Sequence, residues 1–273
     1  MKFGCPVWYG DLRQIGIGKL LGIISDYGFD YIELSADFPV LENLDKKNFK
    51  TLLRKNNLGI AFHSPLGDAA LLNPRGTIRS ATVKLLADCM EFARYFDPLY
   101  FNFHVLGGEP STIRFDEVSA ECVKAGIQSC QEITNIAKSK CVPVTLENHP
   151  SHLFGFPNEL QTVLKKVRGL GFCFDYGHFM LLNGMFKGNK RFKKINLQET
   201  AKMFSGCMVS HIHDYRKKYN EDHLPIGTGE LDIKKIFKTL NSEYNLIEVF
   251  KDKDTGKNLK AIKKGMDFLK KGV

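Results

Sequence analysis

The chain lacks the hallmarks of several protein classes. It has no uncharged apolar run approaching the roughly 18–20 residues that a membrane span needs, so no membrane partner is expected. Its first residues do not have the layout of a signal peptide, because Asp11 and Arg13 precede any apolar segment. With 43% hydrophobic and 25% charged residues and no low-complexity segment, the composition excludes a disordered or collagen-like chain.

A disulfide framework is also missing. The seven cysteines are odd in number, none stands in a C-x-x-C pair, and several fall at apolar positions of expected helices or strands. This usage is typical of reduced thiols. Together with the missing signal peptide, it predicts a cytoplasmic protein.

Arginine is scarce among the basic residues. Of 39 Lys and Arg only nine are Arg, which leaves 30 Lys, and the formal net charge is +9. A basic chain can bind nucleic acid or anionic substrates, but bidentate contacts to phosphate and guanine favour Arg. The lysine excess therefore favours ordinary surface composition, with a phosphate-contacting loop at the dense basic stretch 187–194 as an alternative.

Short apolar runs alternate along the chain with longer segments of helical period. Eight runs, apolar on both faces, are typical of buried parallel strands. These runs are Lys2–Tyr9, Tyr31–Ala36, Gly59–His63, Leu99–His104, Pro143–Asn148, Gly171–Asp175, Cys207–His213 and Asn245–Phe250. The segments with helical period are Leu12–Tyr27, Leu44–Asn56, Thr77–Tyr95, Asp116–Lys138, Asn158–Val167, Leu197–Phe204, Asp232–Leu240 and Asn258–Lys270. The alternation predicts an α/β fold, a single (β/α)8 TIM barrel over residues 1–273, with a doubly wound open sheet as the alternative.

In such a barrel the active site lies at the carboxyl ends of the strands, and titratable side chains gather there. Every histidine lies at or just after an expected strand end, and none lies in an expected helix. The histidines are His63, His104, His149, His152, His178, His211, His213 and His223.

Three carboxylates, Glu147, Asp175 and Glu248, stand in otherwise apolar runs. A buried carboxylate costs several kcal/mol unless it is paired or binds a metal. The mixture of imidazole and carboxylate therefore predicts a site for Mn²⁺, Co²⁺, Zn²⁺ or Mg²⁺, with a structural polar network as the alternative.

The most economical single metal site takes its ligands from four neighbouring strands: Glu147, Asp175, His211 and Glu248. Four other histidines remain for further ions or for substrate: His63, His104, His178 and His223.

Several other residues keep two interpretations. Trp8 either floors the substrate pocket or packs at the bottom of the barrel, and Glu33 is either a pocket carboxylate or an ion-pair partner. His149 and His152 follow a strand and are more often exposed in such a loop than part of a site. His213 alternates with His211, so the two side chains should point apart, with His213 supporting the site from behind.

The motifs, in their order, resemble those of the xylose isomerase-like TIM-barrel superfamily. That superfamily holds sugar-phosphate isomerases and epimerases, the tagatose 3-epimerase group and the endonuclease IV group. The resemblance spans nearly the whole chain. It is most specific in Leu146-Glu147-Asn148, in Phe174-Asp175-Tyr176-Gly177-His178 and in the stretch from His211 to Asp232.

The resemblance first implies a divalent-metal-dependent isomerase or epimerase of carbohydrate metabolism, acting on a small sugar or sugar phosphate. One ion would be held by the four-residue set, and Glu147 and Glu248 would move a proton beside a ketose carbonyl. His178 matches a substrate-binding histidine, and Arg216 or Lys217 falls where the epimerases keep a basic residue. Leu153 departs from the epimerases, which have a glutamate there. Family members are often oligomeric, so a homo-oligomer stays open.

The resemblance also implies an alternative, a multi-zinc endonuclease acting at abasic sites of DNA. Only this alternative has a nucleic-acid partner. Its ligand positions match His63, His104, Glu147, Asp175, His178, His211, His223 and Glu248. A further acid ligand would be Glu221, with Asp222 adjacent. Against this alternative, Leu66 replaces an expected tyrosine, and the loop at residues 35–43 is acidic where DNA binding would need basic residues. The isomerase is favoured; a metal-binding protein without catalysis, or an isomerase of a cyclitol or keto acid, is a third possibility.

Overall fold

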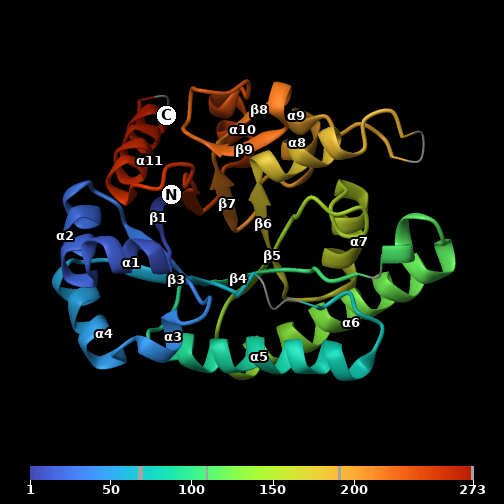
Figure 1. Ribbon diagram of the computed structural model, residues 1–273, viewed down its shortest axis with the longest axis horizontal. Helices are drawn as coiled ribbons and strands as arrows, with labels where there is room; N and C mark the ends of the chain where they lie inside the picture. Colours follow the sequence, from blue (N-terminus) through green and yellow to red (C-terminus); the bar gives the residue numbers. More distant parts are fainter. Residues whose placement is uncertain (67–69, 109, 190–191, 272–273) are drawn as a thin grey trace.

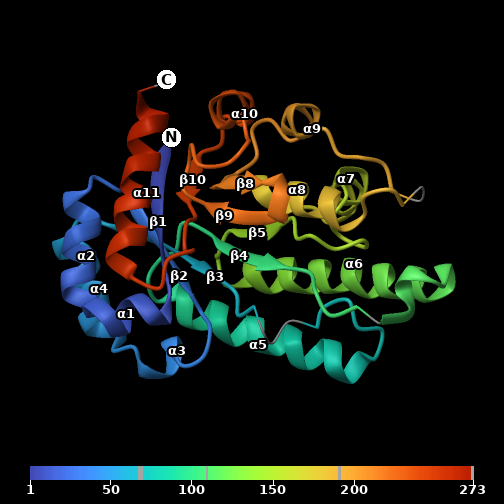
Figure 2. The same ribbon diagram turned by 45° about the horizontal axis from the view of Figure 1, so that its top comes forward.

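A computed structural model describes residues 1–66, 70–108, 110–189 and 192–271. Within them, eight parallel strands close into a barrel in the order β1-β10-β7-β6-β5-β4-β3-β2 (Figures 1 and 2). The barrel strands are β1 (Lys2–Val7), β2 (Tyr31–Ser35), β3 (Gly59–His63), β4 (Phe101–His104), β5 (Val144–Glu147), β6 (Gly171–Asp175), β7 (Val209–Ile212) and β10 (Tyr244–Ile247). The barrel predicted from the sequence is confirmed, and the open sheet is excluded because β1 pairs with β10.

The strands form because their residues are buried on both faces. All five residues of β2 are buried, as expected for a strand between barrel interior and outer helices. Inside the barrel, three tyrosine rings pack edge-on or tilted, with ring centroids 5.5–6.0 Å apart: Tyr31, Tyr100 and Tyr244. The Tyr31 ring lies against Gly4, where a Cβ would collide with it. These rings fill the interior of the barrel, so the space at the carboxyl ends of the strands is closed from below by packed side chains.

Helices surround the barrel and connect its strands. Their bounds are α1 (Tyr9–Ile15), α2 (Ile17–Asp26), α3 (Val40–Asn43), α4 (Lys46–Lys55), α5 (Gly76–Arg94), α6 (Asp116–Ser139), α7 (Pro157–Lys166), α8 (Tyr176–Met185), α9 (Leu197–Met203), α10 (Ile233–Leu240) and α11 (Thr255–Lys270), with 3-10 turns η1 (Pro110–Ile113) and η2 (Lys217–Tyr219). In both views α5 and α6 run side by side, and α11, the last described helix, lies next to β1, the first strand (Figures 1 and 2). None of the described helices is both long and apolar enough to cross a bilayer.

Three features of the fold differ from the prediction. The single helix expected at Leu12–Tyr27 is two helices, because Gly16 has a φ of +80° that interrupts the helical backbone. Helix α8 begins directly after β6 without a loop, so His178 lies in its first turn; the expectation that no histidine is helical is wrong for this residue. A two-stranded antiparallel hairpin, β8 (Asp214–Arg216) and β9 (Glu221–Leu224), follows β7 and carries His223.

The stretch after β7 folds around the carboxylate of Asp214. Its Oδ1 accepts backbone N–H groups from Tyr215 and Leu231, and its Oδ2 accepts those of Gly227 and Gly229, at 2.8–3.1 Å. This carboxylate thereby fixes the hairpin over the end of β7. Gly229 has no room for a Cβ, which would collide with Asp214.

Candidate functional site

Glu147, the last residue of β5, lies at the centre of a group of buried histidines. Its Oε1 is 3.3 Å from His178 Nδ1 and 3.6 Å from His104 Nε2. Its Oε2 is 3.2 Å from His211 Nδ1 and 3.5 Å from His63 Nε2. The amide of Asn102 on β4 also donates to Oε2. Glu147 is only 2% exposed, so this carboxylate depends on its neighbours for compensation.

His211 on β7 lies between three carboxylates. Its Nε2 is 3.3 Å from Oε2 of Glu33 on β2, which resolves the two interpretations of Glu33 in favour of a buried partner at the site. Its Nδ1 is 3.0 Å from Oε2 of Glu248, which follows β10. Despite this distance, neither of these two buried atoms has a hydrogen-bond partner in the described part of the chain. Two buried polar atoms thus face each other without a hydrogen bond, at a position where both could bind a cation.

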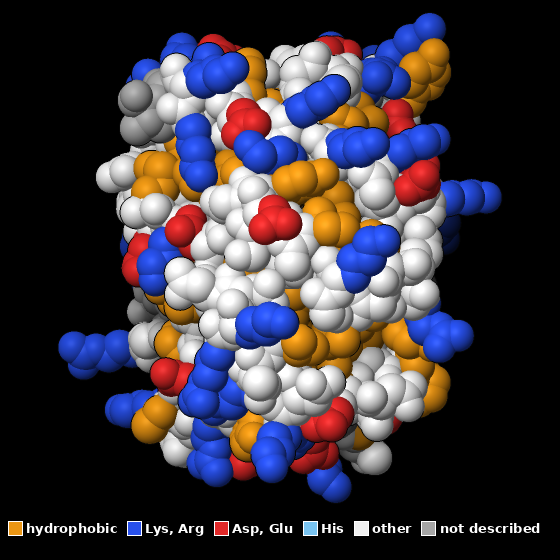
Figure 3. All heavy atoms as spheres, turned by 90° about the vertical axis from the view of Figure 1, so that its left-hand side faces the viewer, with side chains coloured by type: hydrophobic (Ala, Val, Ile, Leu, Met, Phe, Trp, Pro, Cys, Tyr) orange, Lys and Arg blue, Asp and Glu red, His pale blue; other side chains and the backbone are white. Residues whose placement is uncertain are grey.

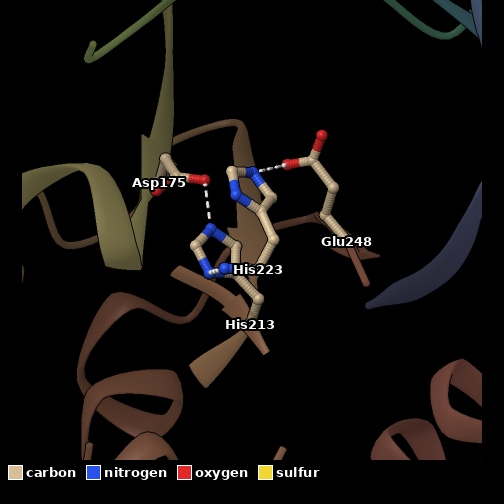
Figure 4. Close-up of side chains that lie close together, drawn as sticks. All are labelled: Asp175, His213, His223 and Glu248. Carbon is tan, nitrogen blue, oxygen red and sulfur yellow. Dashed lines mark hydrogen bonds and ion pairs between the residues drawn. The ribbon is translucent and has the colours of Figure 1, made fainter. Parts of the chain in front are cut away.

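Asp175, at the end of β6, is held at every polar atom. Asn148 accepts the N–H of Asp175 at 2.8 Å and donates to its carbonyl at 3.0 Å. Oδ1 of Asp175 accepts the N–H of His178 at 2.6 Å and so caps α8. Its Oδ2 lies 2.8 Å from His213 Nε2 (Figure 4). The side chain is therefore fixed in place.

The hairpin β8–β9 brings His223 over the strand ends. The backbone N–H of His223 donates to His213 Nδ1 at 2.8 Å. The ring proton of His213 is therefore on Nε2, which donates a hydrogen bond to Asp175. The His213 and His223 rings are stacked with centroids 4.0 Å apart, and His223 Nε2 is 3.6 Å from Glu248 (Figure 4). The expectation that His213 supports the site from behind agrees with its contact to Asp175. The expectation that His211 and His213 point apart is wrong, because residues two apart on a strand share a face, and both side chains reach toward Asp175 and Glu248.

The structure brings the four predicted ligands together. Glu147, Asp175, His211 and Glu248 each offer an atom within 4.8 Å of those of the other three, and all four are buried. Two further groups of this kind share residues with it, His63–His104–Glu147 and Asp175–His213–His223–Glu248, and a third, His178–Asp222–His223, overlaps the last of these at His223. The donor set and the two bare atoms on His211 and Glu248 fit a divalent cation.

The carboxylates control the protonation of the histidines. Burial alone would lower the pKa of His63, but the hydrogen bond with Glu147 and the charge of Glu33 raise it to about 9. In the same way, burial is outweighed by neighbouring carboxylates at His178 and His223, whose pKa values rise to about 10 and about 9. Without a cation, the site therefore holds protons on these rings at neutral pH. A bound divalent ion would supply the same positive charge.

The two glutamates are held ionised. Burial would raise the pKa values of Glu147 and Glu248, but the surrounding histidines hold both well below the usual value. His149, by contrast, stays neutral, because burial and the charge of His178 lower its pKa to about 4. Its ring lies 5.1 Å from that of His104, so the expectation that His149 is exposed is wrong.

Aromatic rings form one wall of the site. Trp8 follows β1, with its ring 6.4 Å from that of His63 and 5.7 Å from that of Phe250. Phe250 lies 4.2 Å from the His223 ring and is 39% exposed, which places it at the mouth. Trp8 Nε1 is buried without a hydrogen-bond partner among the described residues. Of the two interpretations of Trp8, the structure supports the one in which its ring lines the pocket. Nothing in the sequence marks Phe250 as a pocket residue, because it ends an apolar run.

The remaining predicted residues lie further out. Arg216 pairs with Glu221 at 3.7 Å and donates to the Thr228 carbonyl. Lys217 is exposed on η2 and lines a separate cavity next to α8.

On β9, Asp222 and not Glu221 points toward the histidines, with Oδ1 3.0 Å from His223 Nδ1 and Oδ2 3.9 Å from His178 Nε2. The choice of Glu221 as the further acid ligand is therefore wrong. The reason is the backbone of His223, whose φ of +52° breaks the alternation of the strand.

The basic charge on the face over α2 and α4 is dispersed. Figure 3 shows the side of α2 and α4, where Lys and Arg side chains are scattered among acidic, apolar and uncharged ones. Of the basic stretch 187–194, Lys190 and Arg191 lie outside the described residues. This face agrees with the interpretation of the lysine excess as ordinary surface composition.

Comparison with known proteins adds a family and a fold. The family model for the xylose isomerase-like TIM barrel matches residues 21–272, whereas no curated protein sequence matches the chain. Among solved structures, a D-tagatose 3-epimerase-like protein has a TM-score of 0.74 at 22% identity, over 99% of both chains. D-allulose 3-epimerase from Methylomonas sp. has a TM-score of 0.75 at 16% identity, over 100% of this chain and 98% of its own. L-ribulose 3-epimerase has a TM-score of 0.75 at 16% identity, over 99% of this chain and 94% of its own.

Proposed function

Because the chain belongs to the xylose isomerase-like TIM-barrel family, we propose that it is a divalent-metal-dependent isomerase or epimerase of a ketose sugar or sugar phosphate. The observation that carries this proposal is the meeting of two ionised glutamates at one buried centre. Glu147 comes from β5 and Glu248 from the end of β10, strands separated in the barrel by β6 and β7. Two carboxylates that reach one substrate from different strands can remove a proton and return one.

Glu147, Asp175, His211 and Glu248 would hold the ion. Once bound, a divalent cation polarises a ketose carbonyl and acidifies the neighbouring C–H. The protein's own groups would then carry the proton: one ionised glutamate accepts it from the carbon beside the carbonyl, and the other first takes up a proton from solvent and then donates it to the same or the adjacent carbon. Asn102 keeps the Glu147 carboxylate in place throughout by its hydrogen bond.

The histidines and the aromatic wall would receive the substrate. His178 donates from Nδ1 to the Asn148 carbonyl at 2.8 Å, which leaves Nε2 to contact a sugar hydroxyl. Trp8 and Phe250 offer apolar ring faces at the mouth, which suit the C–H face of a sugar and exclude water. The solved epimerases of the same fold are consistent with this substrate class.

Isotope exchange tests the proposal directly. We expect the Mn²⁺-loaded protein, incubated with a panel of ketoses and ketose phosphates in deuterated water, to incorporate deuterium beside the carbonyl of at least one. Glu147→Gln and Glu248→Gln should each abolish this exchange while the protein still folds, as circular dichroism would show, whereas Glu117→Gln, at an exposed position of α6, should keep the exchange. Near-normal exchange in either site variant would rule out the two-glutamate mechanism.

A second candidate function, phosphodiester hydrolysis at an abasic site, is favoured by the additional donor groups. His63–His104–Glu147 and His178–Asp222–His223 could hold two further ions beside the first. Metal counting by anomalous scattering separates the two candidates: one ion favours the sugar reaction, and three favour hydrolysis. Tight, steeply salt-dependent binding of an abasic duplex would likewise favour hydrolysis.

A further inference from the structure

A second cavity, here called the α8 cavity, lies apart from the site just described. It has a volume of about 890 Å³ and lies between the second half of α8, the turn from β8 into η2, and residues 186–188 and 192–194. None of the residues that meet at the candidate metal centre lines it. Its size is within the range of small-molecule pockets, about 300–1,000 Å³.

One wall of the α8 cavity is aromatic. Phe156 and Phe192 are stacked in parallel, with ring centroids 5.0 Å apart and an interplanar angle of 5°. Phe186 lies 4.5 Å from Phe192, and Met180 of α8 extends the apolar surface. These side chains are only partly buried, so they offer flat ring surface to a planar apolar group.

The rim of the same cavity is strongly basic. Five exposed lysines line it: Lys187, Lys193, Lys194, Lys217 and Lys218. In the described part of the chain none of these five forms an ion pair with a carboxylate. The single acid in the lining, Glu230, accepts the backbone N–H of Lys217 at 3.1 Å. Five positive charges against one negative charge favour an anion, and lysine ammonium groups are common phosphate ligands.

We propose that the α8 cavity binds a nucleotide, with the base against the Phe156–Phe192 wall and the phosphates among the lysines. The two halves of the cavity select this class together, because an apolar molecule alone would leave the lysines unpaired and an inorganic anion alone would leave the rings exposed. The proposal is independent of the sugar reaction, since it uses none of the metal-centre residues.

The position of the cavity connects it to the metal centre. One wall belongs to α8, which begins with His178, and another to β8 and the turn at η2 that lead into β9, the strand that carries His223. The two elements meet where Asn220 contacts Gly184 of α8, and both residues line the cavity. A nucleotide there would rest on the outer side of the same helix and hairpin.

Fluorescence anisotropy with N-methylanthraniloyl-ADP as the probe tests the proposal on the full-length protein. We expect saturable binding that ADP reverses, and that pyrophosphate or adenosine alone reverses only at much higher concentration. The double variant Lys193→Ala/Lys194→Ala should weaken binding by about tenfold or more. The matched control Lys165→Ala/Lys166→Ala removes an exposed lysine pair of α7 outside the cavity and should change affinity less than about twofold.

The aromatic wall has its own variant. Phe192→Leu keeps the position apolar but removes the stacked ring, and we expect it to weaken N-methylanthraniloyl-ADP binding by about tenfold or less. The proposal is overturned by any of four results. In the first three, the probe shows no saturable binding, the two lysine-pair variants lose the same affinity, or pyrophosphate displaces the probe as effectively as ADP does. The fourth is that the protein self-associates through this face while the probe stays bound. Loss of sugar turnover would leave the binding result unchanged, so the two proposals fail separately.

Discussion

Replacing Glu33 by Gln should weaken metal binding without removing any metal ligand. Oε2 of Glu33 is 3.3 Å from His211 Nε2, and both residues are buried, at 3% and 0% exposure. By accepting a hydrogen bond from Nε2–H, the carboxylate keeps the ring proton on Nε2 and leaves the Nδ1 lone pair free toward the centre, where Glu147 and Glu248 lie 3.2 and 3.0 Å away. The glutamine amide accepts a weaker hydrogen bond from Nε2 than the carboxylate does. It can also donate a hydrogen bond to Nε2, in which case the ring proton moves to Nδ1 and Nδ1 has no lone pair for the metal.

The size of the effect follows from the charge that is lost. A hydrogen bond to a charged group contributes about 1.5–3 kcal/mol and a neutral one about 0.5–1.5 kcal/mol, so Glu33→Gln loses about 1–2 kcal/mol. This corresponds to a loss of about 5- to 30-fold in affinity. Outer partners of metal ligands usually contribute about 10- to 100-fold, which overlaps this range.

Titration calorimetry of chelator-stripped protein with Mn²⁺ measures this loss. Glu42→Gln, an exposed acid on α3, is the matched control and should bind Mn²⁺ like the parent protein. If Glu33→Gln stays folded and binds Mn²⁺ within twofold of the parent, Glu33 does not set the tautomer of His211 and the reasoning is refuted.

Three further predictions concern protonation and packing. Because the folded-state pKa values of His63, His178 and His223 are raised to about 9–10, the stability they contribute without metal is complete below about pH 6.5. It is lost as the pH rises through 9–10, so melting temperatures of stripped protein should fall there, and a flat profile would contradict this. Mn²⁺ binding displaces these protons, so calorimetry in buffers of different ionisation enthalpy should show proton release, and the affinity should rise from pH 6.5 to 9. Gly177→Ala places a Cβ against the buried His213 ring and 2.9 Å from the Cβ of Asp222, and should cost about 3 kcal/mol or more by thermal unfolding, whereas Gly10→Ala, with no atom within 4 Å, should be nearly neutral.

The barrel was predictable because its signal is local. Each strand is a short apolar run, and two of the eight, at Gly59–His63 and Gly171–Asp175, have the predicted bounds. The meeting of the four candidate ligands was predictable for the same reason, since polar residues that end apolar strands share one edge of a barrel.

Other parts of the site depend on distant contacts that no local pattern shows. Glu33 and His211 are 178 residues apart in sequence, so only the closed barrel decides between the two interpretations of Glu33. The hairpin β8–β9 is polar and follows a strand, and the left-handed backbone of His223 within it cannot be inferred from residue type. With that conformation, Asp222 points toward the site histidines and Glu221 pairs with Arg216. Regular strand alternation would have placed Glu221, and not Asp222, on the same side as His223.

The pairing of β1 with β10 has a consequence for biosynthesis. Trp8 follows the first strand and Glu248 follows the last, so residues from both ends of the sequence line one pocket. A ribosome adds about 5–20 residues per second, so the first strand waits on the order of ten seconds or more for its partner. During that interval the nascent chain has an open edge and lacks Glu248, one of the two glutamates proposed to move the proton. Activity should therefore arise only once β10 has paired with β1, and ribosome-stalled chains ending before residue 244 should be inactive.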